Sequence, residues 1–70
     1  MHEFFKVWGI AKQLYGLERL VHIDLEEAYI RIFLDGKIIV RADGPSEDLE
    51  YIYLTAASYL VDWLQQQGKR

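Results

Sequence analysis

The chain has no cysteine and a single proline among its 70 residues. The lack of cysteine excludes a disulfide framework, a thiol nucleophile and a thiolate metal site. There is no run of 18 apolar residues, and charged side chains interrupt the apolar stretch at the N-terminus. We therefore predict neither a membrane-spanning segment nor a secretory signal, and we expect a cytoplasmic protein.

Positive charge is also scarce. Eight Lys and Arg stand against eleven Asp and Glu, so the net charge is −3, which argues against a generic nucleic-acid binder. Apolar residues are abundant at 51%, which is too many for a disordered chain. A domain of roughly 60–70 residues buries only about 60% of its unfolded surface. We expect a single domain over residues 1–70 that needs a very apolar core or a partner.

Two segments show helical periodicity. Between residues 3 and 15 apolar side chains recur at steps of three and four, and Gly16 follows as a helix stop. Gly9, inside this segment, is expected to mark a close crossing with another backbone. A second apolar stripe predicts a helix over residues 46–67, with Ser46 as its N-cap.

The start of the second predicted helix is acidic. Its first turn contains Glu47, Asp48 and Glu50, and residues 43–68 contain no Lys or Arg. Acidic side chains stabilise a helix N-terminus by interacting with the helix dipole, and this is the simpler interpretation. The alternative is an acidic patch that binds a basic partner.

Between the two helices the apolar period changes from 3.6 to 2, which predicts strands over residues 19–25, 28–34 and 37–42. Asp35-Gly36 between two apolar runs is typical of a two-residue hairpin turn. The Glu26-Glu27 connection is a weaker turn candidate, because glutamate disfavours positive φ. The predicted fold class is α+β, in the order α-β-β-β-α, with an antiparallel three-stranded meander and both helices on one face.

Two-residue turns at both connections would divide the strand residues between two faces. The face turned away from the helices would then hold Leu20, His22, Tyr29, Arg31, Phe33, Ile38 and Val40. Solvent-facing sheet surfaces are normally polar, so this apolar composition predicts an interaction surface. Ordinary exposure of apolar side chains, which is common in small domains, remains the alternative.

The same register brings three chemically active side chains together. His22 and Asp24 share a strand face, and Arg31 is expected opposite His22. Such a group suits proton transfer or anion binding, but a cross-strand charge pair is the favoured interpretation. With two histidines and no local ligand spacing, no metal site is expected. No phosphate-binding glycine loop is present either, so we expect no cofactor and no enzymatic activity.

The order α-β-β-β-α over about 70 residues resembles the double-stranded-RNA-binding domain. In that family the start of the second helix carries a basic cluster that contacts phosphates. Here the corresponding segment, Ser46-Glu47-Asp48-Leu49-Glu50, has the opposite charge. The resemblance therefore implies the topology of that fold, while RNA binding through this helix is electrostatically disfavoured.

Together these features predict a small non-catalytic protein–protein interaction or regulatory module. It would self-associate or bind a protein partner through the outer sheet face. The alternative is a domain that binds nucleic acid or a small anionic ligand. In that case Arg31, Arg41 and His22 would contact the ligand, and Tyr29 and Phe33 would stack on bases.

Overall fold

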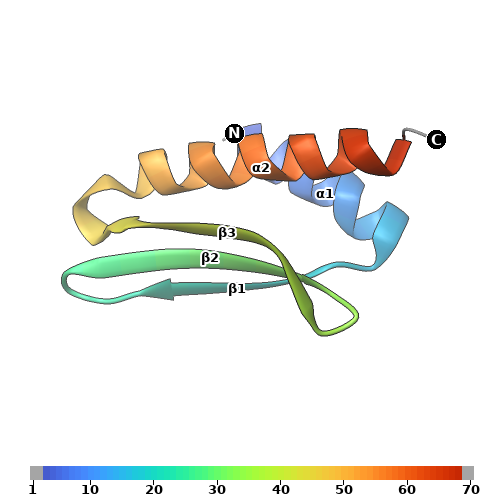
Figure 1. Cartoon of the computed structure of the whole chain (residues 1–70). Helices are drawn as coiled ribbons and strands as arrows, with labels where there is room; N and C mark the ends of the chain where they lie inside the picture. Colours follow the sequence, from blue (N-terminus) through green and yellow to red (C-terminus); the bar gives the residue numbers. More distant parts are fainter. Residues whose placement is uncertain (1–2, 69–70) are drawn as a thin grey trace.

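The computed structural model describes residues 3–68. The elements are α1 (Glu3–Tyr15), β1 (Glu18–Ile23), β2 (Glu27–Leu34), β3 (Lys37–Pro45), a short 3₁₀ helix η1 (Ser46–Asp48) and α2 (Leu49–Gly68) (Figure 1). The strands form one antiparallel sheet in the order β1-β2-β3. The predicted α+β fold and its α-β-β-β-α order are confirmed.

Both helices lie on the same side of the sheet, and α2 extends over most of its length (Figure 1). α1 is shorter and packs beside α2. The core lies between this helical layer and the inner face of the sheet. Its largest fully buried side chains are Phe4 from α1, Ile30 and Ile32 from β2, Val40 from β3, and Ile52 and Leu60 from α2. The sheet therefore has one covered face and one outer face.

A β-bulge in β3 changes the predicted pairing with β2. The hairpin begins as expected, with Asp35 and Gly36 at positive φ (52° and 80°). The register then shifts so that Ile32 faces Val40. Val40 is consequently 2% exposed and belongs to the core, and its predicted place on the outer face is wrong. The extra residue of the bulge turns two apolar side chains, Val40 and Ala42, inward.

The connection between β1 and β2 also differs from the prediction. The backbone N–H of Asp24 donates a hydrogen bond to the carbonyl of Glu27 (2.8 Å), so Leu25 and Glu26 form the turn. The Asp24 side chain accepts a hydrogen bond from the N–H of Leu25 (2.8 Å) within this turn. The pairing of β1 with β2 moves by two residues, so each side chain of β1 stays on the sheet face predicted for it. Leu25, however, which was predicted to end the first strand, lies in the turn and is 95% exposed.

The start of α2 is capped by a different residue from the one predicted. The Ser46 hydroxyl donates to the carbonyl of Leu25 (2.8 Å) and so ties η1 to the β1–β2 turn. Asp48 Oδ1 accepts a hydrogen bond from the N–H of Tyr51 (3.2 Å), which is the N-cap geometry for a helix that begins at Leu49. The prediction of Ser46 as the cap is wrong, because the 3₁₀ helix delays α2 by one turn.

Candidate functional site

The outer sheet face consists of three cross-strand rows that follow from the observed register. They are Glu18–Phe33–Ile38, Leu20–Arg31–Arg41 and His22–Tyr29–Asp43. Six of the seven residues predicted for this face are present, and only Val40 is missing. Arg41 and Asp43 also lie on this face, because the bulge reverses the direction of every side chain that follows it in β3. Asp43 lies beyond the strand predicted over residues 37–42, since β3 extends to Pro45.

The apolar part of the face lies at the end near the β2–β3 hairpin. Leu20 and Ile38 are 49% and 47% exposed, and Phe33 is partly buried. Phe33 lies directly opposite Ile38 of β3. On its other side, Leu20 of β1 is the diagonal neighbour of Phe33. Neighbours at these positions are close enough for their side chains to touch. The three residues, here called the apolar patch, therefore form one continuous surface.

The other end of the face holds a polar cluster centred on Tyr29. The His22 ring stacks on the Tyr29 ring at a centroid distance of 4.9 Å and an interplanar angle of 19°. The Arg31 guanidinium lies 4.3 Å from the centroid of the same ring. Arg31 also forms an ion pair with Asp43, with 2.7 Å between Nη2 and Oδ1. The cluster is therefore a layered arrangement of imidazole, phenol, guanidinium and carboxylate.

The composition of this cluster corrects the predicted one. Asp24 does not join His22 and Arg31, because its carboxylate accepts a hydrogen bond in the β1–β2 turn. Arg31 faces Leu20, while His22 faces Tyr29. The carboxylate beside Arg31 is that of Asp43, which sequence reasoning missed because the bulge determines its direction. The Arg31–Asp43 contact and the His22–Tyr29 stack are consistent with the favoured interpretation of stabilising cross-strand pairs.

Arg41 is a cation of the outer face that forms no ion pair among residues 3–68, although Asp43 lies two residues further along the same strand face. Arg41 lies opposite Arg31 in the middle row and is exposed. Within residues 3–68, Arg31 has Asp43 as its ion-pair partner, whereas no ion pair involves Arg41. The face thus presents one arginine without an ion-pair partner among the described residues, next to the apolar patch.

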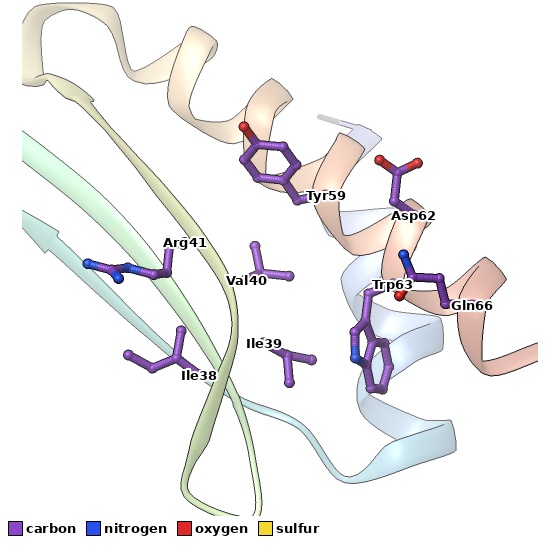
Figure 2. A pocket seen from close by; sticks show the side chains of 8 residues that line it. All are labelled: Ile38, Ile39, Val40, Arg41, Tyr59, Asp62, Trp63 and Gln66. Atoms are coloured by element: carbon purple, nitrogen blue, oxygen red, sulfur yellow. The ribbon is translucent and has the colours of Figure 1, made fainter.

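A groove of about 430 Å³ runs between β3 and α2 (Figure 2). One wall is the segment from Ile38 to Arg41, and the other consists of α2 side chains at helical spacing: Tyr59, Asp62, Trp63 and Gln66. Figure 2 shows Ile39 directed toward Trp63 and Arg41 directed to the opposite side of the strand. The sequence indicated the aromatic residues of α2, but their position beside a strand depends on tertiary packing.

The predicted acidic patch is exposed at the start of α2. Glu47, Asp48 and Glu50 all face solvent, and Asp48 also caps the helix. In the described range, residues 3–68, no three His, Cys, Asp or Glu side chains are close enough to hold a metal ion together. No helix in that range has the length and apolarity needed to cross a membrane.

Comparisons of the chain with protein-family models, with curated proteins and with solved structures give no match.

Proposed function

We propose that the protein is a small non-catalytic interaction module that binds a protein partner through its outer sheet face. The observation that carries this proposal is the apolar patch, in which Leu20, Phe33 and Ile38 adjoin on a face that no helix covers. Single exposed apolar side chains are normal on protein surfaces. A contiguous apolar surface with a polar rim is typical of binding sites.

The surroundings of the patch also suit a protein interface. The centre of an interface is usually apolar and rich in aromatic residues and arginine, and its rim is polar. Here Phe33 lies between Leu20 and Ile38, while Glu18, Arg31 and Arg41 border them. Burial of large apolar and arginine side chains commonly supplies most of the binding free energy. The polar neighbours would fix the orientation of the partner.

The proposal is tested by replacing Phe33 with glutamate. We expect Phe33→Glu to abolish binding, because it places a charge at the centre of the apolar contact. The measurement is quantitative cross-linking and capture from extract with the wild-type chain and the variant. Ile10→Glu is the matched control: Ile10 is 60% exposed and lies on α1, away from the outer face.

A specific partner should be retained by wild-type protein and by Ile10→Glu, and lost with Phe33→Glu. Circular dichroism verifies that all three chains are folded. If the same proteins are captured by all three chains, the outer face is not the binding surface.

The position of Arg41 favours a second candidate function, the binding of a nucleic acid or a small anion. The bulge places Arg41 on the same face as Arg31, His22, Tyr29 and Phe33. Arginines next to aromatic rings can bind phosphates while bases stack on the rings. The net charge of −3 and the Arg31–Asp43 ion pair oppose this candidate.

Fluorescence-anisotropy titration with labelled single-stranded and duplex oligonucleotides distinguishes the two candidates. Nucleic-acid binding would weaken steeply with salt, because bound phosphates release counterions. It would also weaken with Arg41→Ala. Absence of an anisotropy change at low salt removes this candidate.

A further inference from the structure

β3 is an edge strand, and its outer edge lies open beside the groove. The sheet order is β1-β2-β3, so only β2 pairs with it. Among the hydrogen bonds of residues 3–68, none outside the β2–β3 ladder involves the backbone of residues 38–43. An open strand edge is a template for pairing with another strand.

The observed register shows which groups face this open edge. The carbonyl of Glu27 accepts the hydrogen bond from the N–H of Asp24. The backbone N–H and C=O groups of the odd-numbered residues of β2 therefore point toward β1, and those of the even-numbered residues point toward β3. Ile30 therefore exchanges hydrogen bonds with Ala42, its direct partner. The residues on either side, Arg41 and Asp43, direct their N–H and C=O groups outward.

We propose that β3 pairs antiparallel with β3 of a second copy of this chain, across a two-fold axis at Ala42, and forms a continuous six-stranded sheet. In this arrangement Arg41 lies opposite Asp43 of the second copy, and the reverse pair is identical by symmetry. Both residues have outward-facing backbone groups, so each pair exchanges two backbone hydrogen bonds. This proposal is independent of the partner that the outer face binds.

Charge selects this register over its neighbours. An axis at Arg41 would place two arginines opposite each other, and an axis at Asp43 would do the same with two carboxylates. Like charges directly opposite each other in a sheet are destabilising, and opposite charges stabilise it. The axis at Ala42 creates two opposite-charge pairs, and it brings a carboxylate to Arg41, which has no ion-pair partner among residues 3–68. An axis at Ala42 also confines the pairing between the two β3 strands to the segment beyond the bulge, where β3 is regular.

The surface of α2 above the edge fits the same axis. The position of a Cβ at Gly44 would be 3.0 Å from Ile52 Cγ1, and Ile39 lies beside Trp63 in the groove. Ala42 is therefore at the level of residues 55–56 of α2. Thr55, which has a small side chain, lies one turn before Tyr59 on the side of α2 that faces the β3 edge. A small residue near the axis lets the two α2 helices approach closely.

Two exposed tyrosines lie one turn on either side of this point. Tyr51 is 54% exposed and Tyr59 51% exposed. Tyr59 lines the groove beside β3, and Tyr51 Cδ2 is 3.6 Å from the Cβ position at Gly44, so both tyrosines lie on the β3 side of α2. With two antiparallel α2 helices side by side, the tyrosines of one copy would enter the space beside β3 of the other. Tyrosine is enriched in interfaces because it combines apolar area with a polar hydroxyl.

The test is a charge swap between two variants, measured by sedimentation velocity and native mass spectrometry. The wild-type chain should form dimers that dissociate on dilution. Arg41→Glu places two acidic pairs at the axis, and Asp43→Lys places two basic pairs there. Each variant alone should therefore dimerise at least about tenfold more weakly. A mixture of the two should form a heterodimer, because both cross-strand pairs are then of opposite charge.

Lys6→Glu is the matched control for Arg41→Glu. It makes the same change of charge at an exposed position on α1 and should leave the dimer unchanged. Asp43→Lys also removes the contact with Arg31, so circular dichroism must show that this variant is folded. Amide exchange adds an independent measurement: the N–H groups of Arg41 and Asp43 should be protected in concentrated but not in dilute wild-type protein.

Three results would overturn the proposal. One is a wild-type chain that stays monomeric at every concentration. Another is a dimer that is insensitive to Arg41→Glu and lost with Phe33→Glu, which would place the interface on the outer face. The third is a mixture of Arg41→Glu and Asp43→Lys that forms no heterodimer.

Discussion

At the scale of single residues, aspartates determine where the elements of this chain begin and end. The Asp24 side chain accepts a hydrogen bond from the N–H of Leu25 in the β1–β2 turn, Asp35 occupies the hairpin turn with positive φ, and Asp48 caps α2. Short polar side chains compete well for nearby backbone groups, which is why they occur at such positions. The turn-forming role of Asp35 was predictable, but Ser46 and Asp48 are both plausible caps from sequence alone.

The contribution of the cap can be measured with Asp48→Ala. The variant leaves the N–H of Tyr51 without its side-chain acceptor, so we expect the free energy of unfolding to fall by about 1 kcal/mol. Urea denaturation followed by circular dichroism measures the change. Glu47→Ala is the control, because it removes an adjacent exposed acid whose side chain accepts no comparable hydrogen bond in the described chain. Equal losses of unfolding free energy in both variants would show that the effect comes from the removed charge alone and not from the cap.

At the scale of elements, the packing of α2 on β3 depends on one glycine. Gly44 lies where β3 passes under the start of α2, and a Cβ there would meet Ile52 Cγ1 at 3.0 Å and Tyr51 Cδ2 at 3.6 Å. The close crossing that sequence analysis assigned to Gly9 is therefore found at Gly44. No atom lies within 4 Å of the Cβ position at Gly9. A glycine inside a strand often marks such an approach.

Gly44→Ala and Gly9→Ala should therefore have opposite effects on stability. The first requires the Ile52 side chain to shift to make room for the new Cβ, and we expect it to lower the free energy of unfolding by about 1–3 kcal/mol. The second replaces a glycine in the interior of α1 with a better helix former, and we expect it to raise the free energy of unfolding by about 0.5–1 kcal/mol. Thermal and urea unfolding of both variants provide the comparison. Destabilisation by Gly9→Ala would contradict this account of the α1 surface.

At the scale of the whole molecule, limited burial and open surfaces have a common origin. A chain of 70 residues with 51% apolar composition cannot cover all of its apolar side chains with two helices and three strands. Large apolar side chains remain exposed on both helices, on the outer sheet face and beside the β3 edge. The outer-face and edge proposals each assign part of this surface to a partner. The charge-swap and Phe33→Glu experiments measure the two contributions separately.

The sequence by itself determined the element order, the hairpin at Asp35-Gly36 and most of the outer face. These features depend on local periodicity and turn chemistry, which neighbouring residues specify. Only the tertiary structure decided the direction of the side chains beyond the bulge. Val40 and Ala42 turn inward because the helices offer them burial, and Arg41 and Asp43 consequently turn outward. A bulge is a response to packing between distant segments, and strand periodicity cannot reveal it.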